Sequence, residues 1–341
     1  MNRRHVIHTI DSHTGGEPTR LVIAGIPVKG RSLIEQREYV RTNLDDLRAA
    51  LMREPRGHRG MFGAILCPPT TADVDFGIIW IDHDGSYLNM CGHGTIGIGK
   101  VAVECGIVPM VEPKTEFSID MPAGIVRVAS VIENGTVRST AITNVPSFVY
   151  RRDIPIDVPG FGRVEADIAF GGSFFGAVHG DQLGIDVRSE NTGDLVRAGL
   201  AVRKALNEAV DVRHPTKDHI RSVDLVTIYG PPLAKGAKYK NIHVFSDGSF
   251  DRSPGGTGTS HMMALLIDRG EMAPEEEIIS EGISGSTFRG RMLERTKVGD
   301  FDAFVPEIEG SAHLTGFHQF VVEPDDYLTR GLDLETSGST K

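Results

Sequence analysis

The 341-residue sequence has few cysteines and no long apolar run. Three cysteines, Cys67, Cys91 and Cys105, cannot form the dense disulfide framework of a small secreted protein, and they suit a reducing compartment. No apolar run approaches the roughly 20 residues that cross a bilayer, and no apolar core follows Arg3 and Arg4 as it would in a signal peptide. We therefore expect a cytoplasmic protein that does not enter the membrane.

The sequence also has fewer basic than acidic residues. Lysine and arginine number 36 against 46 aspartates and glutamates, which gives a net charge of -10 and argues against nucleic acid or an anionic membrane as partner. The sequence contains no P-loop, no dinucleotide fingerprint and no spaced zinc ligands. With 40% hydrophobic and 24% charged residues, the chain has the composition of a globular protein with one large or two mid-sized domains.

Glycine is abundant, and it clusters around one of the cysteines. Residues 89–97 read Asn-Met-Cys-Gly-His-Gly-Thr-Ile-Gly, and an apolar segment of helical character follows at 96–108. A helix N-terminus has unpaired N–H donors and a partial positive charge, so it binds carboxylates and lowers the pKa of a thiol placed there. The segment therefore predicts an anion site beside a reactive Cys91.

The same pattern occurs twice in the chain. Residues 91–95 align with 255–259, and the match continues down both predicted helices to Gly106 and Gly270, where a C-terminal cap favours glycine. Upstream, residues 76–87 and 241–250 each read as a strand followed by an Asp-Gly turn. A repeat of this length predicts two homologous α/β half-domains.

The boundary between the halves is expected near residues 150–158, which have the composition of a linker. We assign residues 1–155 and 315–341 to the half that carries Cys91, and 156–314 to the half that carries the 251–260 loop. Residues 31–53 and 192–209 predict amphipathic helices at corresponding places, residues 11–20 a polar loop, and 274–277 a first helical turn. Four scattered histidines are interpreted as structural: His5, His8, His83 and His243.

The two Gly-rich stretches resemble the proline racemase family, which includes 4-hydroxyproline 2-epimerases and trans-3-hydroxy-L-proline dehydratases. The resemblance is carried by Met-Cys-Gly-His-Gly at 90–94 and Asp-Arg-Ser-Pro at 251–254. It implies a fold similar to diaminopimelate epimerase, with two pseudo-symmetric halves that each wrap a sheet around a central helix. Further matches lie along the whole chain, at 10–18, 54–58, 167–172, 296–299 and 316–320.

The resemblance also implies a role for each candidate site residue. Cys91 corresponds to a catalytic thiol. By the resemblance, the backbone N–H groups of Gly92, His93, Gly256 and Thr257 hold the carboxylate of a small imino-acid substrate. Asp251 pairs with the ring ammonium of the substrate, and Phe245 is an apolar wall beside its ring. No metal, flavin or pyridoxal phosphate is implied.

Gly255 departs from the family pattern, because racemases and epimerases carry a second cysteine at this position and dehydratases a threonine. Inversion of an α-carbon without a cofactor needs a base on one face and an acid on the other. A single thiol can still remove the α-proton and return it to a C3 hydroxyl on the same face of the ring. Ring stereochemistry thus favours dehydration of trans-3-hydroxy-L-proline to the cyclic imine, provided that Cys91 faces the α-hydrogen.

Two alternatives stay open at this point. One is a proline racemase or hydroxyproline 2-epimerase in which water, Thr257 or Ser253 replaces the second thiol. The other is a catalytically silent imino-acid binding protein. The sequence leaves both a monomer and a homodimer open.

Overall fold

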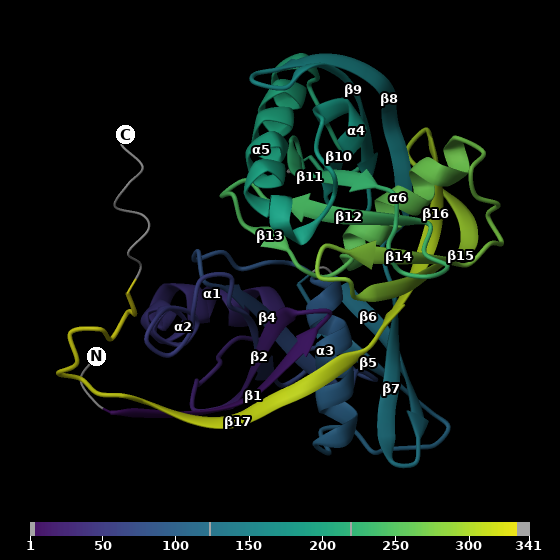
Figure 1. The fold of residues 1–341 in the computed structure, drawn as a ribbon. Coiled ribbons are helices and arrows are strands. Elements are labelled where there is room, and N and C mark those ends of the chain that lie inside the picture. The colour runs from purple at the N-terminus through teal and green to yellow at the C-terminus, as the bar shows by residue number, and fades with distance from the viewer. Residues whose placement is uncertain (1–3, 123, 219, 333–341) are drawn as a thin grey trace. The chain divides into compact units, whose positions relative to one another are not determined.

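The computed structural model describes residues 4–122, 124–218 and 220–332, and it divides into two compact units (Figure 1). The first comprises Met1–Thr140 and Ala312–Lys341, and the second Ala141–Ser311. The chain changes unit within β7 (Thr136–Thr143), and again between β16 (Phe301–Gly310) and β17 (Ala312–Val322). Residues 333–341 of the expected first half lie outside the described residues.

The segment that we expected to link the halves is part of a strand. β8 (Ser147–Val158) pairs antiparallel with β9 (Gly162–Phe170) inside the second unit. Its alternating residues Ile154, Ile156 and Val158 are buried in that unit's core. The structural division therefore falls near residue 140, because the apolar alternation of 154–158 outweighs the charged and proline-containing composition.

In the first unit, a sheet wraps around the central helix α3 (Gly92–Glu104) (Figure 1). The strands follow the order β17–β1–β2–β3–β4–β5–β6, with parallel pairing at β2–β3 and β4–β5 and antiparallel pairing elsewhere. Residues 92 and 94–103 of α3 are buried, as expected for a helix enclosed by strands. The strand bounds are β1 (His5–Thr14), β2 (Glu17–Ala24), β3 (Phe62–Cys67), β4 (Phe76–Asp82), β5 (Lys114–Met121) and β6 (Gly124–Glu133).

Two expectations for this unit are wrong. Residues 31–53 form two helices, α1 (Leu33–Asn43) and α2 (Asp45–Met52), because Leu44 leaves helical geometry at φ -134°. α2 is largely buried, so this segment is not a single surface helix. Residues 11–20 are mostly strand: β1 and β2 form a hairpin that turns at Gly15 and Gly16, both at positive φ.

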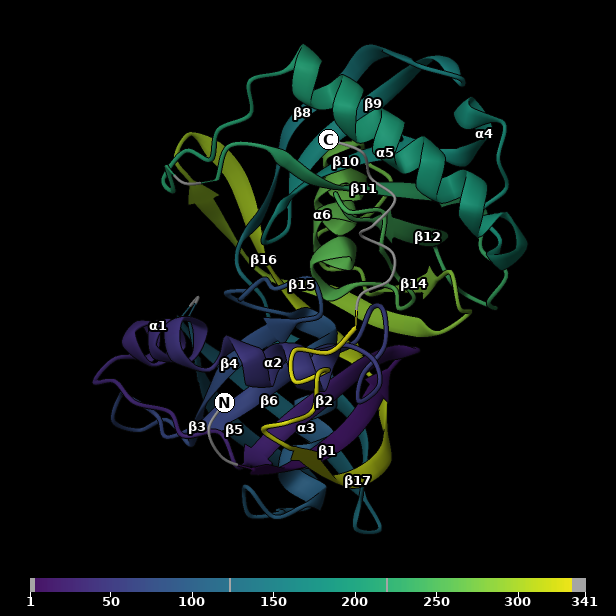
Figure 2. The same cartoon turned by 90° about the vertical axis from the view of Figure 1, so that its left-hand side faces the viewer.

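In the second unit, the sheet closes on itself around α6 (Gly256–Asp268) (Figure 2). The ring runs β8–β9–β10–β11–β12–β14–β15–β16 and returns to β8. Residues 274–277 form a turn before β14 and not the expected helical turn. The remaining bounds are β10 (Phe174–His179), α4 (Gly180–Leu183), η1 (Ser189–Asn191), α5 (Thr192–Ala209), β11 (Val223–Gly230), β12 (Tyr239–Val244), β13 (Phe250–Asp251), β14 (Ile278–Gly282) and β15 (Thr287–Val298).

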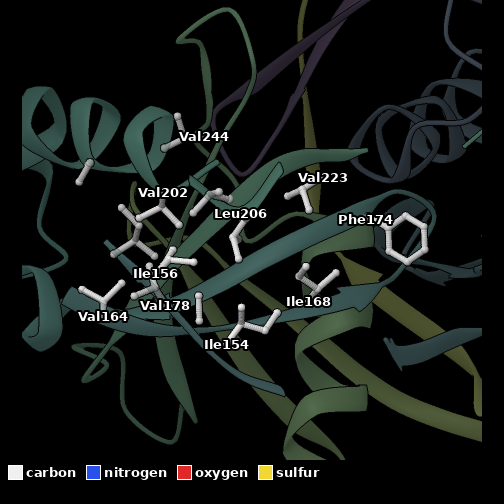
Figure 3. Close-up of a cluster of buried hydrophobic side chains, with 14 of the residues drawn as sticks. Ile154, Ile156, Val164, Ile168, Phe174, Val178, Val202, Leu206, Val223 and Val244 are labelled. Atoms are coloured by element: carbon white, nitrogen blue, oxygen red, sulfur yellow. The ribbon is translucent and has the colours of Figure 1, made fainter. Parts of the chain in front are cut away.

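Helix α5 covers the outer face of this ring, where the apolar core shown in Figure 3 lies. Val202 and Leu206 of α5 pack in the same cluster as Val223 of β11 and Val244 of β12. β12 therefore presents Val244 to α5 and the preceding residue, His243, to α6, as alternation along a strand requires.

The predicted C-terminal caps are confirmed in both central helices. Gly106 and Gly270 adopt φ of +75° and +72°. The next residue closes each helix in the same way, with Ile107 N–H donating to Ala102 O and Glu271 N–H to Leu266 O, both at 2.8 Å. In the described part of the chain, no helix combines the length and the apolar character needed to cross a bilayer.

We predict that two glycines of α5 respond oppositely to alanine. A Cβ at Gly199 would lie 2.7 Å from Val244 Cβ, whereas one at Gly193 would meet nothing within 4 Å. Both variants gain about 0.5–1 kcal/mol of helix propensity, but overpacking costs about 1–3 kcal/mol. Gly199→Ala should therefore lower the urea midpoint of unfolding and Gly193→Ala should leave or raise it. A Gly199→Ala variant as stable as the parent would contradict this packing.

Candidate active site

Cys91 is the N-cap residue of α3, with extended backbone at φ -144° and ψ 122°. Gly94 N–H donates to its Sγ at 3.4 Å, and the ring nitrogens of His93 lie 3.4 and 3.6 Å from the same sulfur. The Thr95 hydroxyl donates to Cys91 O at 2.6 Å and fixes the turn. The thiol is half-buried, so one N–H donor and the positive end of the helix dipole favour its thiolate form while the sulfur stays reachable.

The other two cysteines have different surroundings. Cys67 is buried on β3, and desolvation followed by the nearby Asp120 carboxylate raises the pKa of its thiol to about 12. Cys105 is half-buried after α3, where desolvation and Glu104 raise its thiol pKa as well. Neither environment favours a thiolate at neutral pH.

An aromatic ring supports the first turn of α3 from below. A Cβ at Gly94 would lie 2.6 Å from the indole of Trp80, so only glycine at this position lets the ring pack under the helix. Phe62 stacks on that indole at 5.4 Å and meets the His93 ring edge-on at 5.1 Å. Cys91, Gly92 and His93 thus lie at the start of α3, and their catalytic and binding roles stay predictions.

The start of α6 also follows a Gly-rich stretch, but its N-cap residue has no thiol and a different backbone φ. Gly255 is its N-cap residue, at φ +71° and ψ 123°, a region that favours glycine. The following helical residues, Gly256 and Thr257, begin the helix, whose first N–H groups have no partner within it. The chain therefore has a second helix N-terminus of the kind that favours anions, and its N-cap has no acid or base of its own.

Asp251 lies next to this helix end and is almost fully buried. Its Oδ1 accepts hydrogen bonds from Ser253 N–H at 2.8 Å and Ser253 Oγ at 2.7 Å, and Ser253 Oγ accepts from Gly255 N–H at 3.1 Å. Ser253 thus links Asp251 to Gly255 at the start of α6, and the binding roles of Asp251, Gly256 and Thr257 stay predictions. Phe245 lies in the turn after β12, where its N–H donates to Ser249 O at 2.9 Å, and its role as a pocket wall stays a prediction.

His243, which the sequence interpretation treated as structural, is buried next to this helix end. His243 lies under the first turn of α6, directly against Gly258, in the place that Trp80 occupies against Gly94 in the other unit. Its imidazole also adjoins Gly255: a Cβ there would lie 2.6 Å from His243 Cδ2 and 2.7 Å from Nε2. The internal repeat aligns the His243 imidazole with the Trp80 indole of the other half, so the sequence contained a signal that this ring could pack under the helix.

Burial shapes the acid–base character of His243 and of its neighbour His261 on α6. Desolvation lowers the pKa of His243, against a smaller opposite effect of Asp251. The pKa of His261 lies well below its ordinary value for the same reason, reinforced by His243. Among the described residues, no group of three histidines, cysteines or carboxylates could hold a metal ion.

Known proteins with related sequences define the class of enzyme to which this site belongs. The family model described as proline racemase matches residues 9–333. The proline racemase of Acetoanaerobium sticklandii is 48% identical over 95% of this chain and 97% of its own. A trans-3-hydroxy-L-proline dehydratase from Bacillus cereus is 39% identical over 97% and 99%.

Solved structures agree with this result. The crystal structure of a hydroxyproline epimerase from Agrobacterium vitis, with bound trans-4-hydroxy-L-proline, has a TM-score of 0.85 and 30% identity over 97% of this chain and 96% of its own. The protein is thus similar throughout to enzymes that act at proline-type rings. The chain belongs to the proline racemase family, and the mixed α/β fold expected from the resemblance is confirmed.

We predict that iodoacetamide distinguishes the three cysteines. Near pH 7, Cys91 should be alkylated first, because its sulfur is half-buried at a helix N-terminus, whereas raised thiol pKa values protect Cys67 and Cys105. Peptide mapping by mass spectrometry over a time course checks the order. The Cys91→Ser variant is the control, and equal labelling of Cys67 and Cys91 in the folded protein would contradict the assignment.

Proposed function

We propose that this protein removes the α-proton of a proline-type imino acid with Cys91, without a cofactor, and that its main reaction is dehydration of trans-3-hydroxy-L-proline. The observation that carries the proposal is the difference between the two helix starts. The N-cap of α3 is a thiol and the N-cap of α6 is glycine. Dehydration is the family reaction that needs only one acid–base group.

The two helix ends account for binding of the substrate. Backbone N–H groups of Gly92 and His93, which begin α3, and of Gly256 and Thr257, which begin α6, would donate to its carboxylate. The buried Asp251 would pair with the ring ammonium and keep it protonated. Both contacts stabilise the carbanion character that develops at the α-carbon, which is otherwise a weak acid.

The elimination then follows from ring stereochemistry. In trans-3-hydroxy-L-proline, the C3 hydroxyl lies on the same face of the ring as the α-hydrogen. The Cys91 thiolate takes the α-proton, the C3–O bond breaks, and the thiol returns the proton to the departing hydroxyl as water. The resulting enamine tautomerises to the cyclic imine, and the thiolate is regenerated.

Racemisation or 2-epimerisation is the second candidate. The observation in its favour is that the relative named proline racemase is 48% identical, against 39% for the relative named dehydratase. This reaction needs a second acid–base group where Gly255 has none.

Proton NMR in D2O separates these reactions. We expect cyclic imine from trans-3-hydroxy-L-proline. This product should be lost in Cys91→Ser, because the variant lacks the thiolate that takes the α-proton. The enzyme would be incubated separately with trans-3-hydroxy-L-proline, trans-4-hydroxy-L-proline and L-proline.

Other outcomes assign the protein differently. Epimers of the 4-hydroxy compound or of proline without any imine would replace dehydration by inversion. No turnover of any of the three, with ligand affinity retained, would identify a silent imino-acid binding protein.

A further inference from the structure

Strand β17 forms an open edge of the sheet in the first unit. Its residues 312–322 pair antiparallel with β1, and Figure 1 shows the strand along the border of this sheet. Among the described residues, no other strand forms a comparable ladder with β17. The backbone N–H and C=O groups on its far side can therefore accept a further strand.

The composition of β17 does not protect this edge. Edge strands of soluble proteins are commonly protected from pairing by charged residues or proline. The 11 residues of β17 include no aspartate, glutamate, lysine, arginine or proline. Its one irregularity is a bulge at Thr315, because Asp11 pairs with Gly316 and Ser12 with Leu314. The segment 316–322 is thus a regular and uncharged edge.

Apolar side chains are exposed together on one face of this segment. Phe317 is 69% exposed and Val321 is 42% exposed. Val6 of β1 lies directly opposite Val321 and is 41% exposed. Side chains alternate along a strand, so the exposed Gln319 lies between Phe317 and Val321 on the same face. A contiguous exposed apolar strip of this kind marks an interaction site.

The order of side chains along this strip is self-complementary. When a second β17 runs antiparallel with Gln319 opposite the same residue of the other copy, Phe317 of each copy lies opposite Val321 of the other. Pairs of an aromatic and a β-branched side chain are favourable across neighbouring strands. The paired segment is then 316–322, which ends just before the bulge at Thr315.

The charges at the two ends of β17 fit the same arrangement. His13 and His313 lie opposite each other at the beginning of the strand, with ring centroids 5.2 Å apart. Glu323 and Asp325 follow its end, and both are exposed. Antiparallel pairing brings the carboxylates of one copy to the imidazoles of the other, whose ring N–H groups are donors. Parallel pairing would bring like groups together.

We propose that β17 is the surface through which two copies of this chain form a symmetric dimer, with the twofold axis at Gln319. The same surface then serves both copies, as in the commonest class of homodimer. Hydrogen bonds between the two strands join the sheets of the two first units, and the pairing shields Phe317 and Val321 from water. The proposal is independent of the reaction at Cys91, because none of the residues on this surface belongs to the candidate active site.

The mass in solution tests the proposal. In size-exclusion chromatography with light scattering, the parent should have about twice the 37.0 kDa mass of one chain at micromolar concentration. Gln319→Lys should have the mass of one chain, because two lysines then meet at the twofold axis. Thr315→Lys is the matched control on the same strand. Its lysine would lie next to Glu323 of the other copy, so this variant should stay dimeric.

Disulfide trapping tests the register. Residues directly opposite each other on antiparallel strands have Cβ atoms about 4.5–5.5 Å apart, close to the separation that a disulfide spans. Gln319→Cys should therefore form a covalent dimer under mild oxidation. Phe317→Cys and Val321→Cys should cross-link when the two variants are mixed and far less when each is alone. The parent, with its own three cysteines, is the control for other disulfides.

Three outcomes would overturn the proposal. The first is a parent that stays monomeric at micromolar concentration. The second is a dimer that persists in Gln319→Lys without cross-linking in Gln319→Cys, which would place the interface elsewhere. The third is efficient cross-linking of Phe317→Cys alone, which would move the axis away from Gln319. Circular dichroism of each variant shows that a loss of mass reflects dissociation and not unfolding.

Discussion

The close packing of an aromatic ring under a glycine of each central helix is the contact on which both half-sites depend. Trp80 under Gly94 and His243 under Gly258 support the first helical turn from the sheet side. A side chain at either glycine would displace the ring and tilt the helix start. The first backbone N–H groups of each helix are therefore positioned by a ring below the turn, and the sheet wrapped around the helix holds that ring in place.

The two units share this plan but differ in their chemistry. In the first, the N-cap has a thiol and the supporting ring is an indole; in the second, the N-cap has no side chain and the supporting ring can carry a proton. The two differences in the second unit are coupled, because a Cβ at residue 255 would collide with the imidazole. Gly255 is thus part of a repacked helix start, in which the absence of a side chain leaves room for the imidazole.

Much of this arrangement was predictable from the sequence, because it depends on local pattern. The repeated Gly-rich helix starts and the capping glycines 106 and 270 follow from residue types at fixed spacing. The break at Leu44 and the strand at 151–158 were not predictable in the same way, since both depend on which neighbours bury the side chains. The contact of His243 with α6 was not predictable for a related reason: the sequence pattern places this residue on a strand, but only the fold shows which face of the strand meets α6.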